Sequence, residues 1–113
     1  MNQKLEDLVK KYMMKKYLYK ELDEAVRGNS GHKWNFDAIV RHNDERFGIF
    51  IKDWNRSIGV NQVRLIEKAC IDMGFQGGVI VGNMFSSHAK NYGKAKGVQI
   101  VTRSELIMKS RFS

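Results

Sequence analysis

The segment from Trp34 to Trp54 constrains the fold more than any other part of this sequence. It holds two short apolar runs, 36–42 and 47–54, which are separated by the polar residues 43–45. Apolar runs on both sides of a short polar turn are typical of a β-hairpin. We therefore predict two antiparallel strands here, and the other elements must pack around them.

Side chains alternate between the two faces of a strand, so residues of the hairpin can be assigned to faces. In the second strand Phe50 and Lys52 share one face, and in the first strand Asp37 and Ile39 share one face. The carboxylate of Asp37 and the ammonium of Lys52 converge if Asp37 pairs toward the Lys52 side. Such a pair indicates a place where a divalent metal and a polarised water can sit.

The stretch before the hairpin begins with a predicted helix over residues 2–16. Its apolar residues follow a helical period, with charged residues around the rest of the surface. This stripe consists of Leu5, Leu8, Val9, Tyr12 and Met13. Beyond residue 16 the spacing of apolar residues suits either a continuing helix or a strand, and periodicity does not decide between them.

The stretch after the hairpin alternates between helices and strands. We predict a helix over 60–73 that stops at Gly74, a buried strand over 77–82, and a helix from Ser86 to Gly97. A strand over 98–101 and a last helix over 102–108 follow, the helix opened by a capping box of Thr102 and Glu105. A hairpin followed by such alternation predicts an α/β fold, with a mixed sheet and helices on both faces.

Composition limits the class of protein. A chain of 113 residues fits a single domain, which we expect to span residues 1–113. No apolar run is long enough to span a bilayer, and the N-terminus lacks the apolar core of a secretory signal, so we expect a cytoplasmic protein with no membrane partner. The single cysteine, Cys70, sits in a helical apolar pattern and is expected to be a buried hydrophobe.

The charge of the chain points to a polyanionic partner. Lysine and arginine total 20 against 12 acidic residues, which gives a net charge of +8. Nucleic acid is the commonest partner of so basic a surface. The alternative is a basic composition that reflects no binding at all.

Several motifs in this order resemble the core of PD-(D/E)XK nucleases. They are the glycine-containing segment Gly28–Gly31, a strand that opens with Phe36 and Asp37, and a hydrophobic strand that ends in Lys52, Asp53 and Trp54. The likeness is to Mrr-type restriction endonucleases and archaeal Holliday-junction resolvases, and it continues through 78–82 and 85–97. It implies a restriction-endonuclease-like sheet of four to five strands, with one strand around residues 22–27. It also implies metal-dependent cleavage of phosphodiester bonds in DNA, of the restriction or the repair and recombination type.

The resemblance assigns roles to individual residues. Asp37 matches the metal-binding aspartate and Lys52 matches the lysine, which would orient the attacking water or steady charge on the phosphate. The main-chain carbonyl of Ile51 and the carboxylate of Glu6 are further expected ligands of Mg²⁺ or Mn²⁺. The plainer interpretations are a strand-end aspartate, a solvated edge lysine, and a first-turn glutamate favoured by the helix dipole.

The sequence departs from the family pattern at one position. The family has Glu, Asp or Gln two residues before the lysine, and Phe50 stands there. An aromatic ring offers no oxygen to a hard cation. Whether the chain is an enzyme therefore stays open, and the alternative is a catalytically degenerate nuclease fold that acts as a nucleic-acid or protein-interaction module.

Polar and basic residues outside this motif are the expected contacts to DNA. They are Ser30, His32, Lys33, Arg56, Lys90, Lys94 and Lys96. The sequence contains no base-reading motif, so we expect recognition of backbone or DNA structure, with RNA as a further possibility. Trp34 and Trp54 are expected to pack at the core edge rather than stack on a base. A homodimer is expected as well, because one small domain cannot enclose a duplex.

Overall fold

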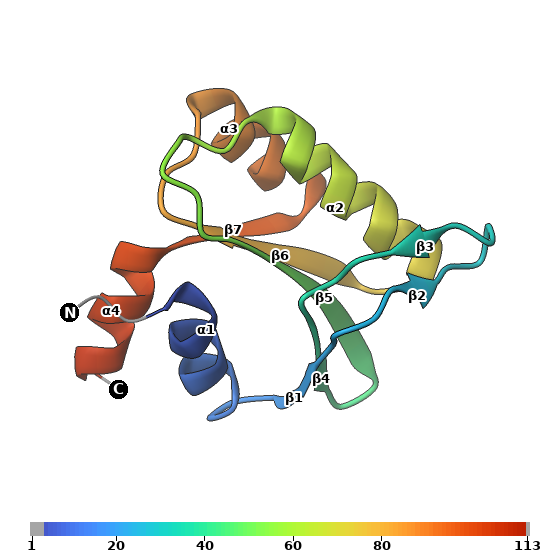
Figure 1. The fold of residues 1–113 in the computed structure, drawn as a ribbon, viewed down its shortest axis with the longest axis horizontal. Helices are drawn as coiled ribbons and strands as arrows, with labels where there is room; N and C mark the ends of the chain where they lie inside the picture. The colour runs from blue at the N-terminus through green and yellow to red at the C-terminus, as the bar shows by residue number, and fades with distance from the viewer. Residues whose placement is uncertain (1–3, 113) are drawn as a thin grey trace.

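The computed structural model describes residues 4–112 as helices packed on both faces of one central sheet (Figure 1). The helices are α1 (Leu5–Met13), α2 (Val60–Met73), α3 (Ser87–Lys96) and α4 (Arg103–Phe112). The strands are β1 (Leu18–Glu21), β2 (Val26–Arg27), β3 (Lys33–Trp34), β4 (Ala38–His42), β5 (Glu45–Lys52), β6 (Gly77–Gly82) and β7 (Val98–Thr102). The predicted α/β fold with a mixed sheet is confirmed.

The central sheet has five strands in the order β1-β4-β5-β6-β7. The predicted hairpin is present, because β4 and β5 pair antiparallel, with His42 opposite Glu45. Strands β5, β6 and β7 run parallel, so their carboxyl ends lie at the same end of the sheet. Strands β2 and β3 form a separate two-stranded sheet, which projects beside the C-terminal end of α2 (Figure 1).

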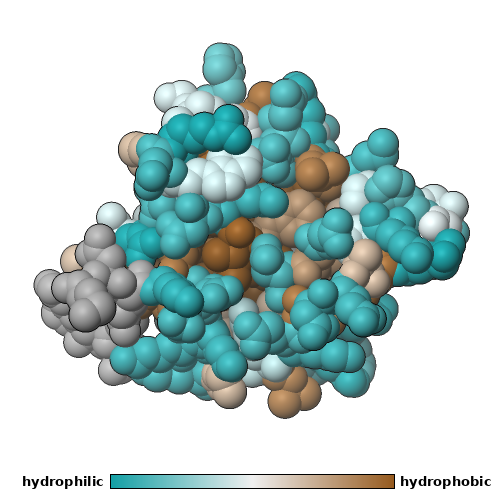
Figure 2. Space-filling model, in the orientation of Figure 1, coloured by the Kyte–Doolittle hydropathy of each residue, from teal (hydrophilic) through white to brown (hydrophobic). Residues whose placement is uncertain are grey.

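Each face of the sheet carries its own hydrophobic core. Helices α2 and α3 cover one face, where Phe36, Phe50 and Ile80 pack with Ile66 of α2. Helices α1 and α4 lie on the other face, where residues of α1 pack with Ile49 of β5. Figure 2 shows hydrophobic surface between these two helical layers, within a face that is otherwise mostly hydrophilic.

The helix boundaries follow the local signals in the sequence. Gly74 ends α2 with φ of 72°, and Gly97 ends α3 with φ of 74°. The hydroxyl of Ser86 accepts a hydrogen bond from the Ala89 N–H at 3.1 Å and so caps α3. The side chain of Cys70 is buried, and burial raises the pKa of its thiol to about 11, as expected for a packed hydrophobe.

The reciprocal capping box at the start of α4 is also present. The N–H of Glu105 donates to the Thr102 hydroxyl at 3.2 Å, and the N–H of Thr102 donates to the Glu105 carboxylate at 3.3 Å. These two bonds satisfy backbone donors at the point where the chain leaves β7. They therefore stabilise the start of α4 directly after β7.

Two predictions before the hairpin are wrong in extent. Helix α1 ends at Met13 rather than at residue 16, while residues 2 and 3 lie outside the described part of the chain. The single strand implied around 22–27 is absent, because the sheet uses Leu18–Glu21 instead and Val26–Arg27 pairs with β3. Within residues 4–112, no helix is long and apolar enough to cross a membrane.

Candidate functional site

A pocket at the N-terminal end of α1 brings together the acidic residues that the sequence indicated. It has a volume of about 370 Å³, and we call it the Asp37 pocket. Its lining consists of Lys4, Leu5, Glu6, Asp37, Ile51 and Asp53. The structure therefore brings Glu6, Asp37 and Ile51 to one pocket, whereas Lys52, which the sequence-based site places beside Asp37, does not line it.

Asp37 reaches this pocket because the strand pairing is irregular where β4 begins. Ala38 is the Cα partner of Ile49, yet the N–H of Asp37 also donates to the Ile49 carbonyl at 2.9 Å. Asp37 and Ala38 thus both lie opposite Ile49, which is the arrangement of a β-bulge. A bulge changes the face of the sheet toward which a side chain points. The Asp37 carboxylate turns to the α1 side and accepts a hydrogen bond from the Ile51 N–H at 2.6 Å. The prediction that Asp37 shares a face with Ile39 is wrong for this reason.

Phe50 and Lys52 lie on the other face of β5. The Phe50 side chain is 3% exposed and packs against Phe36, with 5.4 Å between the ring centroids. The Lys52 ammonium lies 5.1 Å from the centroid of the Phe50 ring and 5.8 Å from that of Trp54. The ammonium therefore lies among aromatic rings, and Lys52 is not among the residues that line the Asp37 pocket.

The pKa of Tyr19, in β1, is affected by the carboxylates of this region. Burial is the main cause that raises the pKa of Tyr19 to about 12, and the charge of Glu21 adds to it. The charges of Asp37 and Glu6 act in the same direction. A tyrosine outside such surroundings has a pKa of about 10. Our sequence analysis did not single out this phenol, because the pairing of β1 with β4 was not predicted.

We predict that stability falls as the pH rises through the interval between these two pKa values. The unfolded chain releases the Tyr19 proton first, so it binds fewer protons than the folded chain in this interval, and unfolding becomes easier. Ultraviolet titration of the folded protein and of Tyr19→Phe checks the assignment. The variant should lack an ionisation step near pH 12, and loss of a step near pH 10 instead would contradict the raised pKa.

A second polar group lies beside the Asp37 pocket, at the carboxyl ends of the three parallel strands. Asp53 follows β5, Asn83 follows β6 and Arg103 follows β7. The Asn83 side-chain amide donates to Asp53 Oδ1 at 2.9 Å, and Arg103 Nη2 lies 2.9 Å from the same oxygen. The hydrogen bond from Asn83, followed by that from Arg103, holds the pKa of Asp53 below its usual range.

Our sequence analysis did not identify Asn83 or Arg103. The available signal is that each residue directly follows a buried strand, and ligands of parallel sheets bind beyond the carboxyl ends of strands. The cavity beside them has a volume of about 500 Å³ and shares Lys4 and Asp53 with the Asp37 pocket. The two cavities therefore form one polar surface beside the start of α1.

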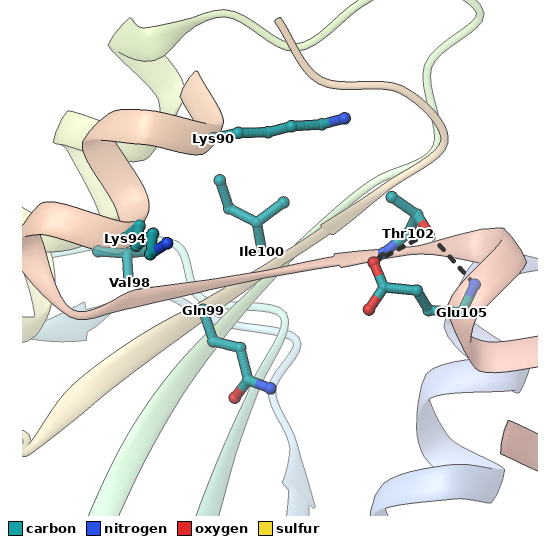
Figure 3. Close-up of a pocket in the computed structure, with 7 residues that line it drawn as sticks. All are labelled: Lys90, Lys94, Val98, Gln99, Ile100, Thr102 and Glu105. Carbon is teal, nitrogen blue, oxygen red and sulfur yellow. Dashed lines mark hydrogen bonds between the residues drawn. The ribbon is translucent and has the colours of Figure 1, made fainter. Parts of the chain in front are cut away.

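The predicted basic contacts lie along more than one cavity. Lys90 and Lys94 of α3 line a cavity of about 430 Å³ beside the edge strand β7, opposite Glu105 (Figure 3). Lys96 lines a different cavity, and the guanidinium of Arg56 lies 4.3 Å from the ring centroid of Trp54. The predicted basic contacts are therefore distributed over several places on the surface and do not line one common groove.

The glycine loop, residues 28–32, is bound to the end of α2, and Lys33 begins β3. Asp72 accepts hydrogen bonds from the Ser30 N–H at 2.8 Å and from the Ser30 hydroxyl at 2.7 Å. Gly28 allows this approach, since a Cβ there would collide with the Asp72 carboxylate, and Gly31 adopts a φ of +91°. The loop holds Ser30 and His32 in a cavity at the end of α2, and none of its residues lines the Asp37 pocket.

Comparison with known families identifies the fold. The profile of the Mrr catalytic domain, described as a restriction endonuclease, matches residues 1–108. The chain belongs to this restriction endonuclease family. The resemblance to Mrr-type enzymes that the sequence motifs indicated is therefore confirmed. Among curated proteins, none matches this sequence significantly.

Solved structures similar to this Mrr-family chain share its fold. A crystal structure of a protein of unknown function superposes with a TM-score of 0.75 at 20% identity, over 92% of this chain and 61% of that one. A repair endonuclease from Pyrococcus abyssi gives a TM-score of 0.58 at 13% identity, over 90% and 48%. EndoMS in its apo form gives 0.54 at 14% identity, over 90% and 47%. The Mrr-family chain thus spans about half to three fifths of these longer chains.

Members of the Mrr family generally use divalent metal ions, so the donor set of the pocket decides whether one fits. Among residues 4–112, no three His, Cys, Asp or Glu side chains are close enough to form a metal site on their own. The Asp37 pocket still offers the carboxylates of Asp37 and Glu6 beside the Ile51 main chain. Magnesium binds through one or two carboxylates and keeps several waters, so this donor set fits magnesium better than a metal that needs a full protein cage.

Proposed function

We propose that this chain is a DNA-binding nuclease domain that cleaves phosphodiester bonds with the help of a divalent metal, as an intracellular endonuclease of the restriction or repair and recombination type. One observation carries the proposal. Two carboxylates from distant parts of the chain, Glu6 and Asp37, line one open pocket beside the Ile51 peptide. The net charge of +8 and membership of the Mrr family support a polyanionic substrate.

The proposed ligands of the metal are Asp37, Glu6 and the main-chain carbonyl of Ile51, with Mg²⁺ or Mn²⁺ as the ion. A bound magnesium would polarise the phosphate and lower the pKa of an attacking water. Asp37 is already oriented, because the Ile51 N–H holds one of its carboxylate oxygens. Its second oxygen is the one available for a ligand.

Lys52 is the proposed cation that orients the water or steadies charge on the phosphate. In the free protein its ammonium lies against the rings of Phe50 and Trp54. The side chain is long and half-buried, so rotation about its own bonds changes where the charge lies. The proposal therefore requires Lys52 to leave the two rings when DNA is bound.

Cleavage assays test this function directly. Plasmid, branched and single-stranded DNA are incubated with the purified protein in Mg²⁺ or Mn²⁺, with a chelator as the control. Metal-dependent cleavage supports the enzyme. Binding of DNA without cleavage of any of these substrates favours the second candidate function.

We propose that DNA is held through its backbone or its structure, and that two copies of the chain act together on the two strands. The proposed contacts are Ser30, His32, Lys33, Arg56, Lys90, Lys94 and Lys96. Sedimentation of the free and the DNA-bound protein measures the number of copies. A matched competition with DNA and RNA of the same length separates the two nucleic acids.

We predict that Lys90→Gln with Lys94→Gln weakens DNA binding mainly at low salt. Each lysine that neutralises a phosphate contributes about 0.9 to the slope of log K against log salt, so the double variant should lose up to about 2 from that slope. Titrations at several salt concentrations measure it. The exposed pair Lys11→Gln with Lys15→Gln is the control for net charge, and an equal loss in the control would contradict a specific role of α3.

The second candidate function is a catalytically degenerate Mrr-family fold that binds nucleic acid or protein. Phe50 favours it, because the side chain where the family has an acid or an amide is packed in the apolar core. The position of the Lys52 ammonium between aromatic rings points the same way. This function requires binding that persists without metal and without cleavage.

A further inference from the structure

A pocket at the C-terminal end of α2 has no part in the proposed cleavage. Its volume is about 440 Å³, within the range of about 300–1,000 Å³ that small-molecule sites occupy. Its lining residues come from the glycine loop, from β3 and from α2. They are Ser30, His32, Trp34, Lys68, Ile71 and Asp72, and we call it the His32 pocket.

One wall of the His32 pocket is aromatic. The rings of His32 and Trp34 lie 4.2 Å apart between centroids and are tilted by 49°. Trp34 is buried, at 6% exposure, whereas His32 is exposed. The outer ring of this pair is therefore accessible, and the buried indole supports it from behind.

The opposite wall is one face of α2. Lys68, Ile71 and Asp72 are three and four residues apart, which places them side by side on a helix. Ile71 is 71% exposed, the highest exposure of any large apolar side chain described in the helices. The wall thus combines the exposed Ile71 side chain with the ammonium group of Lys68.

Asp72 makes the pocket rigid. Its carboxylate accepts hydrogen bonds from the Trp34 indole N–H at 2.7 Å and from Ser30. The bond from Trp34, followed by those from Ser30, lowers the pKa of Asp72. The Trp34 indole is thereby held beside α2, and the His32 N–H donates to the Ser30 hydroxyl at 3.2 Å, which ties the His32 backbone to the same carboxylate through Ser30.

We propose that the His32 pocket binds one unpaired base of a nucleic acid, stacked on the His32 ring. This deepens the proposed function, on whose nucleic-acid binding it rests, and it makes the preferred substrate class a strand with an unpaired base. A base in this pocket would contact the His32 ring with one face and the Ile71 side chain with the other. A strand that carries such a base keeps its charged backbone at the rim, where Lys68 can contact a phosphate.

The chemistry of the pocket favours a base over other occupants. A phosphate alone gains nothing from the aromatic and aliphatic walls, and its charge would lie near the Asp72 carboxylate. A base has no charge and offers both donors and acceptors beside Ser30. Stacking of a base on an aromatic side chain is also tolerant of sequence, which suits a chain without a base-reading motif.

The experiment compares two single-stranded oligonucleotides of equal length, one of thymidines and one in which every base is absent. Their phosphates are the same, so a difference in affinity reports on the bases. We expect the wild type to bind the thymidine strand more tightly than the abasic strand. His32→Ala should lower the affinity for the thymidine strand by about ten-fold more than it lowers the affinity for the abasic strand, because one stacking platform is lost.

Two further variants sharpen the result. His32→Phe keeps the ring and should restore the preference for bases, while His88→Ala removes an exposed histidine of α3 and should change nothing. The base pocket is overturned if the wild type binds both strands with equal affinity. It is also overturned if His32→Ala loses affinity equally for both strands. In either case nucleic-acid binding itself stands. Absence of binding to either strand overturns the base pocket, and binding of plasmid or branched DNA then decides whether the DNA-binding proposal stands. Asp37→Asn should keep the preference for bases, so failure of cleavage is separable from failure of this pocket.

Discussion

Asp37→Asn is expected to lower metal-dependent DNA cleavage by at least about 100-fold. Mutation of residues that only hydrogen-bond to the ligands of a metal already lowers metal affinity or activity by about 10–100-fold, and Asp37 is a proposed ligand itself. The substitution is nearly isosteric. The amide oxygen can still accept the hydrogen bond from the Ile51 N–H, so the bulge and the fold should survive. What is lost is the negative charge that a hard cation requires.

The control for this variant lies in the same hairpin. Asp44→Asn removes the same charge from the exposed turn between β4 and β5, and its cleavage rate should equal that of the wild type. Rates are compared under single-turnover conditions in Mg²⁺ and in Mn²⁺. Cleavage by Asp37→Asn at the wild-type rate would exclude the Asp37 pocket as the active site.

Local signals in the sequence predicted most of the elements. The apolar stripe of α2, its stop at Gly74 and the hydroxyl cap of Ser86 depend only on neighbouring residues, and these helices appear where they were expected. The hairpin was predictable for the same reason. Each of these features is decided by interactions within a few residues of the chain.

The features that the sequence did not reveal depend on pairing between distant residues. The bulge at Asp37 arises from how β4 meets Ile49, and one extra residue reverses the face of a side chain. The contact between Asn83 and Arg103 requires knowing that β6 and β7 are parallel neighbours. Apolar periodicity carries no information about either arrangement.

Phe50→Glu is expected to destabilise the protein by about 4 kcal/mol or more. Removal of a buried phenylalanine side chain alone costs about 3–5 kcal/mol, and the introduced carboxyl must also leave water. The ring of Phe50 packs on Phe36, which in turn packs on Phe75 at 5.5 Å, so the loss affects a chain of aromatic contacts. Unfolding by urea, followed by circular dichroism, measures the difference.

Two controls isolate the cause. Phe50→Leu keeps an apolar side chain and should cost less than half as much. Leu18→Glu introduces the same carboxyl at a residue that is 72% exposed, where surface substitutions change stability by about 0.5 kcal/mol or less. Because burial raises the pKa of a carboxyl, the deficit of Phe50→Glu should shrink as the pH is lowered and the group becomes neutral.

The effect of magnesium on the stability of Phe50→Glu tests whether position 50 faces the proposed metal site. If position 50 faced the metal, Phe50→Glu would restore the family's missing ligand, and magnesium would stabilise the folded variant by mass action. The structure predicts the opposite, because Phe50 packs on the α2 side of the sheet while Asp37 opens to the α1 side. Unfolding of Phe50→Glu should therefore be equally easy with and without magnesium. A stabilisation that depends on magnesium and disappears in combination with Asp37→Asn would mean that β5 can turn position 50 toward the Asp37 pocket.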